Sequence, residues 1–167
     1  MMYILLGIDG VLTSIAYSQQ CRLENKQPNM FGLDWFDPNC TNALRKITDA
    51  TSAKVIISSS WRNLGIDKLR SLWVANQMPG DITGITPEWI LTKEDALQEW
   101  IRLHPDDRYV ILDDTNYGLS HQIQTIHGIG LTMRDATTAI CLLNLPVIQT
   151  SNRLKTIMEK ILTNNSI

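Results

Sequence analysis

Short apolar runs alternate along the chain with segments of helical periodicity. The runs over 2–8, 54–58 and 108–113 each lead into polar or acidic residues. Between the last two runs, Ala96, Leu97 and Trp100 recur at helical spacing. Strands that are apolar on both faces are typical of parallel sheets covered by helices on both sides. The sequence therefore predicts an α/β fold, with a doubly wound parallel sheet and helices on both faces.

The same periodicity places the remaining elements. We expect helices over 41–51, 65–76, 93–103, 133–144 and 151–163, and a fourth strand over 125–131. Thr41 or Asn39 is expected to cap the first helix, while Thr92 and Thr132 cap the third and fourth. Residues 13–39 lack a regular pattern. Because long irregular segments are usually functional, we interpret 13–39 as a lid or loop insert. The segment is short, so we expect only a minimal cap over the site rather than a separate cap domain.

Composition limits the classes of protein that the chain can belong to. Its 167 residues, 44% hydrophobic and 19% charged, fit one globular domain over 1–167. A net charge of −2 gives no basic surplus of the kind that marks nucleic-acid binding. The three cysteines are widely spaced, which favours a reducing, cytoplasmic setting over a disulfide framework. No apolar stretch approaches the roughly 20 residues of a membrane span, so no membrane partner is expected.

Polar side chains follow each predicted strand. They are Asp9, Ser58, Ser59, Asp113 and Asp114, joined by Lys93 at the start of a helix. Ligands of open parallel sheets bind beyond the carboxyl ends of the strands, so these side chains are expected to converge there. Carboxylates suit Mg²⁺, while hydroxyls and an ammonium group suit a phosphate. Each signal alone is ordinary, but their joint placement predicts a metal-assisted phosphate site.

Five stretches, in this order, resemble the haloacid-dehalogenase-like (HAD) phosphohydrolases. The chain is most similar to the HAD-like domain found in Swiss Army Knife RNA repair proteins. The matching stretches are GIDGVLTS (7–14), 37–62, KEDALQEWI (93–101), RYVILDD (108–114) and GLTMRDATTAICLLN (130–144). Within them, SSSWR and YVILDD are the most specific parts.

The resemblance implies an Mg²⁺-dependent phosphomonoester phosphatase with a Rossmann-like fold. It implies that Asp9 is the acid/base, and that Asp9, Asp113 and Asp114 hold the metal. The phosphate is held by Lys93 and a serine hydroxyl. The implied partner is a phosphorylated small molecule or a nucleic-acid end.

Two details of this implied phosphate site stay open. The serine is Ser58 or its neighbour Ser59, because the sequence does not fix the strand end to one residue. Arg62 either contacts the substrate phosphate or forms an ion pair with Asp113 or Asp114.

The departure from the family pattern is Gly7, which stands where the family has its nucleophilic Asp. Glycine has no side chain, so the covalent route is closed and the metal loses an anionic ligand. We expect a rate cost of about 10⁴–10⁶-fold. Three explanations stay open: a pseudoenzyme that binds phosphate or metal, slower direct hydrolysis through Asp9 or a metal-bound water, or a substitution introduced into an active parent.

The main alternative is a non-catalytic module that binds a phosphate or a protein. Gly7 and the aromatic residues Phe31, Trp35 and Phe36 support it, although we expect those rings to pack in the core or lid rather than stack on bases. A site left open by the Trp35 segment would admit a large substrate. The histidines, which we expect in structural or surface roles, share no metal-ligand spacing; they are His104, His121 and His127.

Overall fold

The computed structural model describes residues 1–28 and 35–145, so the helix expected over 151–163 lies outside the described residues. A five-stranded parallel sheet has the strand order β3-β2-β1-β4-β5. Its strands are β1 (Met2–Leu6), β2 (Lys54–Ile57), β3 (Ile82–Ile85), β4 (Arg108–Asp113) and β5 (Gln122–Gln124). The predicted doubly wound α/β fold is therefore confirmed.

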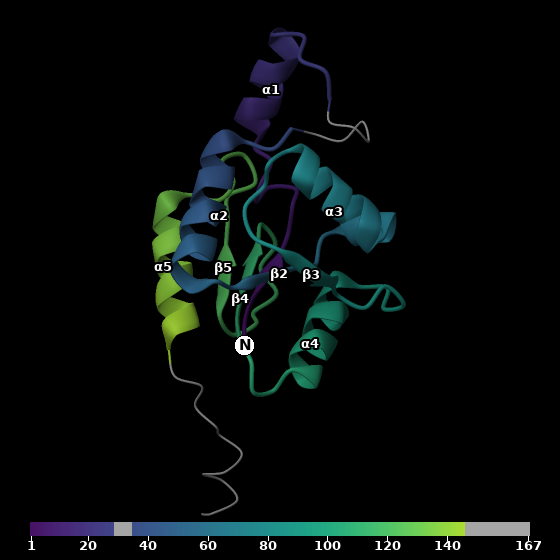
Figure 1. Ribbon diagram of the computed structural model, residues 1–167, viewed down its shortest axis with the longest axis vertical. Coiled ribbons are helices and arrows are strands. Elements are labelled where there is room, and N and C mark those ends of the chain that lie inside the picture. The colour runs from purple at the N-terminus through teal and green to yellow at the C-terminus, as the bar shows by residue number, and fades with distance from the viewer. Residues whose placement is uncertain (29–34, 146–167) are drawn as a thin grey trace, which may run out of the picture.

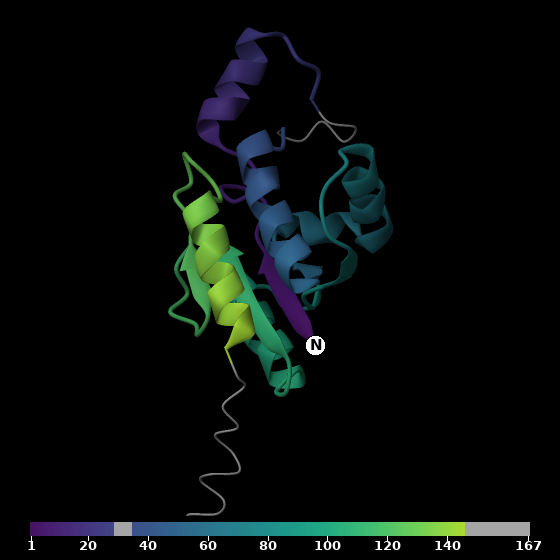
Figure 2. The same cartoon turned by 60° about the vertical axis from the view of Figure 1, so that its left-hand side comes forward.

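Helices cover both faces of this sheet. The helices of the described residues are α1 (Ile15–Leu23), α2 (Pro38–Thr51), α3 (Ile66–Ala75), α4 (Lys93–Leu103) and α5 (Met133–Asn144), with a short 3₁₀ helix, η1 (Ser60–Leu64). Side chains of α2, α3 and α5 belong to the hydrophobic cluster on one face, and side chains of α4 to the cluster on the other. Helices α2 and α5 lie side by side, and α4 lies apart from them (Figures 1 and 2). Within the described ranges, no helix has the length and apolarity needed to cross a bilayer.

Successive side chains of β1 point alternately into two hydrophobic clusters, one on each face of the sheet. Ile4 and Leu6 point into the cluster that includes residues of α2, α3 and α5. Leu5 points the other way, where it packs with Leu97 and Trp100 of α4. This alternation follows from the two-residue repeat of a strand, and it explains why β1 has to be apolar throughout.

The carboxyl ends of the three central strands are level with one another. Leu6 pairs in register with Ile57 of β2 and with Leu112 of β4. One residue further on, the Gly7 amide donates to the Leu112 carbonyl over 2.8 Å, and the Ser58 amide donates to the Leu6 carbonyl over 2.9 Å. We call this edge of the sheet the carboxyl edge.

The prediction of a strand over 125–131 is wrong. The paired strand is β5, at Gln122–Gln124, and the chain then turns, with the Ile126 carbonyl accepting from the amides of both Ile129 and Gly130 over 2.8 Å. The Leu131 amide returns to the Val11 carbonyl, also over 2.8 Å. The apolar residues here resemble a strand in sequence, but Gly130 has a positive φ of 78° that suits a turn.

Two further expectations need correction. Asp37 caps α2 by accepting from the Asn39 amide over 2.8 Å, in place of Thr41 or Asn39, and Pro38 opens the helix. Strand β3 was not predicted, because Thr83 and Gly84 interrupt its apolar pattern at the edge of the sheet. The caps at Thr92 and Thr132 are confirmed.

The segment 13–39 is more regular than the sequence predicted. It contains α1, whose cap residue Ser14 accepts from the Tyr17 amide over 3.2 Å. Figure 1 shows α1 above the carboxyl edge, at the end of the molecule opposite the amino terminus. Phe36 packs in the core between Trp61 and Trp73, whereas Phe31 lies outside the described residues.

Candidate functional site

Asp113, the last residue of β4, is the most buried carboxylate of the carboxyl edge. Its side chain is 1% exposed, and the ammonium group of Lys93 lies against its Oδ2 atom. The other oxygen accepts from the Thr115 amide over 3.2 Å and from the Tyr117 hydroxyl over 3.3 Å. Burial raises the pKa of Asp113, and Lys93 opposes that shift with a smaller effect. The structure thus brings Lys93 and Asp113 into direct contact.

Gly7 lies directly beside this carboxylate. A Cβ atom added to Gly7 would be 2.7 Å from Asp113 Oδ2 and 3.1 Å from both the Leu112 carbonyl oxygen and Val11 Cγ2. Any side chain at position 7 therefore requires the Asp113 carboxylate to move. The position where the family has its nucleophile is next to a carboxylate that comes from a different strand.

Asp9 is held at the mouth of the site by Trp61. The Trp61 indole donates to Asp9 Oδ2 over 3.0 Å, which ties the end of β1 to the turn after β2. Asp9 is exposed and lines a cavity of about 290 Å³ with Gly10, Thr13 and residues of α1. Trp35 does not line this cavity; its indole donates to the Gln27 carbonyl over 2.7 Å. The carboxylate of Asp9 is therefore accessible from solvent.

The two serines after β2 differ in their hydrogen bonds. Ser59 accepts from the Trp61 amide over 3.3 Å and so caps η1. The Ser58 hydroxyl is fully buried and has no hydrogen-bond partner among the described residues. Buried hydroxyls without a partner are rare in folded proteins, and they are typical of sites that contact water or a ligand. Of the two, Ser58 is the hydroxyl with unused bonding capacity.

Arg62 braces the backbone around the site. Its guanidinium donates to the Ser58 carbonyl over 3.1 Å and to the Ile90 carbonyl over 3.3 Å. Among the residues described, it forms no ion pair with Asp113 or Asp114. Arg62 therefore joins the end of β2 to the loop that precedes Lys93.

The sequence did not single out His127 as a site residue. Its Nδ1 atom lies 2.5 Å from Asp114 Oδ2, and it lines the same cavity as Asp9. Gly10 makes this contact sterically possible, since a Cβ there would lie 2.5 Å from the Asp114 oxygen and 2.6 Å from His127 Nδ1. His127 comes from the loop after β5, outside the stretches that carry the family resemblance. The sequence carried no spacing signal that joins it to Asp114.

The carboxylates have the chemistry that Mg²⁺ prefers, but they are not gathered around one point. Within 1–28 and 35–145, no three His, Cys, Asp or Glu side chains lie close enough together to hold a metal ion. Lys93 already contacts Asp113, and His127 contacts Asp114. Gly7 contributes no ligand. A divalent ion bound here competes with Lys93 for Asp113 Oδ2 and with His127 for Asp114 Oδ2.

The predicted site residues therefore share the carboxyl edge but not one cavity. Lys93 and Asp113 touch, and Asp9 lies with His127 in the cavity beside α1. Of the described residues that line this cavity, none is Ser58, Lys93 or Asp113.

The sequence model of the family described as the HAD domain in Swiss Army Knife RNA repair proteins matches residues 3–136. This range holds β2 to β5 in full, β1 except for its first residue, and all the strand-end residues described above. The chain belongs to this family. Membership supports a phosphohydrolase-type function at the level of the HAD superfamily, whose members generally use Mg²⁺. No curated protein and no solved structure matches the chain.

Proposed function

We propose that this HAD domain is a catalytically impaired phosphomonoester phosphatase that binds a phosphate-terminated ligand. The observation that carries the proposal is at Gly7, where no nucleophile exists and Asp113 Oδ2 lies 2.7 Å from the position of a Cβ atom. The family description supports a nucleic-acid end as the ligand. The three free cysteines support a cytoplasmic setting, because such thiols stay reduced there.

In this proposal, Lys93 and Ser58 hold the phosphate. The Lys93 side chain is 25% exposed, so its ammonium can meet a ligand while it remains against Asp113. Ser59 and Arg62 act on the same site by positioning: Ser59 caps η1, and Arg62 holds the Ser58 and Ile90 carbonyls. Asp9 is the acid/base, and the Trp61 indole fixes the oxygen that it presents.

The metal part of the proposal assigns Mg²⁺ to Asp9, Asp113 and Asp114. When bound, Mg²⁺ supplies charge neutralisation for the phosphate oxygens. We expect weak affinity, because position 7 gives no anionic ligand and two of the three carboxylates already have a cationic or imidazole partner. Calorimetric titration with Mg²⁺ should show tighter binding for Gly7→Asp than for the unaltered chain.

The decisive experiment compares the unaltered chain with Gly7→Asp on an aryl phosphate in the presence of Mg²⁺. We expect detectable turnover in Gly7→Asp alone, with a rate about 10⁴–10⁶-fold above that of the unaltered chain. Gly7→Asn is the matched control, because it crowds Asp113 equally but supplies no nucleophile. Circular dichroism of both variants reports whether the fold accommodates a side chain at this position.

Equal turnover by the unaltered chain and Gly7→Asp would overturn the loss of catalysis and indicate direct hydrolysis that involves Asp9. Absence of turnover in both, without detectable binding of inorganic phosphate, favours the alternative of a protein-binding module. The features that favour this alternative are Gly7 and the exposed side chain of Trp89.

A further inference from the structure

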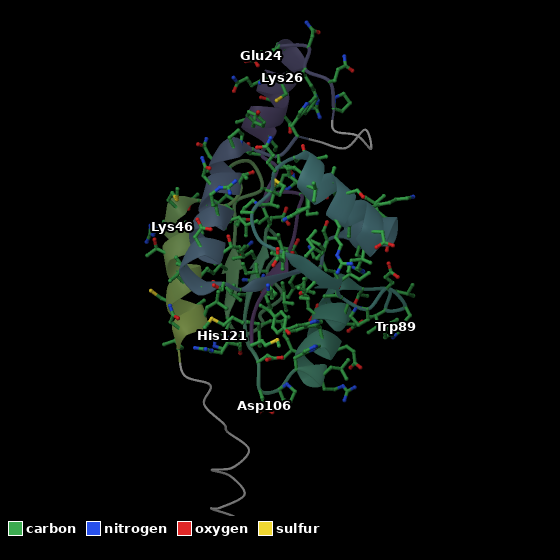
Figure 3. The ribbon with its side chains drawn as sticks, viewed as in Figure 1. Glu24, Lys26, Lys46, Trp89, Asp106 and His121 are labelled. Carbon is green, nitrogen blue, oxygen red and sulfur yellow. The ribbon has the colours of Figure 1, made fainter. Side chains whose placement is uncertain are left out.

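The loop of residues 86–92, between β3 and α4, presents two large apolar side chains to solvent. Trp89 is 80% exposed and Leu91 is 97% exposed. Figure 3 shows Trp89 at the outer edge of the molecule, on the loop beside α4. Single exposed apolar residues are common on protein surfaces, so this exposure gains meaning only from the surroundings of the loop.

The loop is fixed in place by hydrogen bonds along its length. At its start, the Thr86 amide donates to the Ile57 carbonyl over 3.0 Å. In its middle, the buried guanidinium of Arg62 donates to the Ile90 carbonyl over 3.3 Å. At its end, Thr92 caps α4 by accepting from the Asp95 amide over 3.1 Å. The backbone around Trp89 is therefore pre-organised, and a ligand that meets the indole has little ordering to impose.

Trp89 forms one wall of a cavity of about 420 Å³, which we call the Trp89 cavity. Three further rings line it: Trp100 packs edge to face on Tyr3 at 5.2 Å and stacks on His104 at 4.0 Å. Its volume lies within the roughly 300–1,000 Å³ of small-molecule sites. Aromatic walls of this kind suit a flat ring.

Polar groups in the cavity add donors and acceptors for such a ring. They come from Thr83, Thr86 and Glu88. Thr86 is fully buried, and its hydroxyl has no hydrogen-bond partner among the described residues. A buried hydroxyl without a partner favours a polar ligand atom over a purely apolar side chain from another protein.

A charged group that follows the loop in the sequence suggests which ring the cavity takes. Lys93 does not line the cavity, but it follows Trp89 by four residues and opens α4, with its ammonium against Asp113. An exposed indole and an ammonium on one rigid loop and helix start are complementary to a base and its phosphate. The net charge of −2 gives no support for contacts along a long phosphate backbone, so the end of a strand fits better.

We propose that the Trp89 cavity binds the nucleobase at the phosphorylated end of a single-stranded nucleic acid. The base stacks on the Trp89 indole, and the Thr86 hydroxyl and the Glu88 carboxylate offer hydrogen bonds to its edge. This inference rests on the proposed function, since the phosphate of the same nucleotide is assigned to Lys93. Stacking tolerates every base, so the site reads the presence of a base more than its identity.

The test uses a short single-stranded oligonucleotide with a 5′-phosphate, and a second one whose terminal nucleotide is abasic but keeps that phosphate. Fluorescence anisotropy at low salt gives the affinity of each. We expect Trp89→Ala to bind the first probe about 5–150-fold more weakly and the abasic probe unchanged. Trp89→Phe should restore much of the loss. Val74→Ala, a change of an exposed apolar residue on α3, is the matched control.

Equal affinity of Trp89→Ala and the unaltered chain for the first probe would overturn this inference, as would failure of the unaltered chain to bind it. If the unaltered chain binds the two probes with equal affinity and Trp89→Ala changes neither affinity, Trp89 and Leu91 belong instead to a protein-binding surface. The proposed function is read separately, through binding of inorganic phosphate and its loss in Lys93→Ala. If the chain binds inorganic phosphate but Trp89→Ala does not change its affinity for the first probe, the base site is wrong and the proposed function stands.

Discussion

The middle of the sheet and its carboxyl edge are both buried, yet they differ in how their polar groups are satisfied. Through Ile4, Leu5 and Leu6, the sheet has apolar side chains on both faces and a continuous register with its neighbours. At the carboxyl edge lie the described side-chain atoms that are buried without a hydrogen-bond partner: Ser58 Oγ, Arg62 Nε, Thr86 Oγ1 and Asp113 Oδ2.

For Asp113 the Lys93 ammonium lies against that oxygen, so its charge is compensated although no hydrogen bond of normal geometry forms. These groups end or follow β2, β3 and β4. Buried polar groups without partners lower stability, and proteins keep them mainly where they bind a ligand. The difference indicates that the sheet interior supplies stability and that the carboxyl edge gives some of it up for binding.

The largest expected effect is in the interior. Leu44→Ala removes a fully buried side chain of α2 from the core, so the free energy of unfolding should fall by about 2–5 kcal/mol. Urea denaturation measures it. Asn42→Ala, at an exposed position of the same helix, is the control and should change stability by less than about 0.5 kcal/mol. A loss below about 1 kcal/mol for Leu44→Ala would contradict a tightly packed interior.

A smaller loss is expected from Gly10→Ala at the carboxyl edge. Gly10 has a φ of 68°, and an added Cβ would collide with the Asp114 and His127 side chains. Backbone strain of this kind costs about 1–3 kcal/mol, measured by thermal or urea unfolding. Gly118→Ala is the matched control, because Gly118 has a similar φ of 66° and nothing lies within 4 Å of its added Cβ. Equal effects of the two changes would show that the Asp114 and His127 contact does not constrain Gly10.

Two threonine substitutions compare a hydroxyl that caps a helix with a buried hydroxyl that has no partner among the described residues. Thr132→Val removes the cap of α5 and should cost about 1 kcal/mol. Thr86→Val replaces a buried hydroxyl that has no partner among the described residues, so its effect should stay within about 0.5 kcal/mol or be stabilising. Urea unfolding of both variants checks this. A loss at Thr86 as large as at Thr132 would mean that the Thr86 hydroxyl is already satisfied.

The smallest expected effect is that of Asp113→Asn on the pH dependence of the free energy of unfolding. Burial raises the pKa of Asp113 in the folded protein, so the folded state holds this proton more tightly than the unfolded chain does. The resulting stabilisation is present below the ordinary pKa and is lost as the pH rises through the raised one. Asn carries no such proton, so Asp113→Asn should gain stability relative to the unaltered chain as the pH rises above the ordinary Asp pKa of about 4.

This measurement uses urea unfolding without added divalent cations. A shift in the other direction, with the unaltered chain gaining stability as the pH rises, would show that the Lys93 contact outweighs burial. Asp135→Asn provides a comparison, because Asp135 belongs to the capping box of α5, where its carboxylate accepts from the Thr132 amide over 2.9 Å.

The difference between interior and edge also explains which elements could be predicted. The apolar runs that became β1, β2 and β4 need burial on both faces, and that requirement is visible in a few consecutive residues. Strand β3 was missed because an edge strand with Thr83 and Gly84 has no such pattern. The segment after β5 was taken for a strand because Ile126 and Ile129 are apolar, yet both are exposed and belong to a turn.

The site divides in the same way. Strand-end chemistry at Asp9, Ser58 and Asp113 was readable from the sequence, because a polar residue after an apolar run marks the end of a strand. The partner of each group was not. Trp61 is 52 residues from Asp9, His127 is 13 from Asp114, and Arg62 turned to backbone carbonyls in place of a carboxylate.

By itself, the amino-acid sequence determined the class of fold, the caps at Thr92 and Thr132, and the kinds of side chain that stand at the strand ends. These follow from local periodicity and local hydrogen bonding, which act over a few residues. Only the tertiary structure decided that Asp113 fills the space beside Gly7, that His127 meets Asp114, and that Trp89 stands outside on a braced loop. Such contacts depend on the paths of the crossover connections, which bring distant residues together and which no short stretch of sequence specifies.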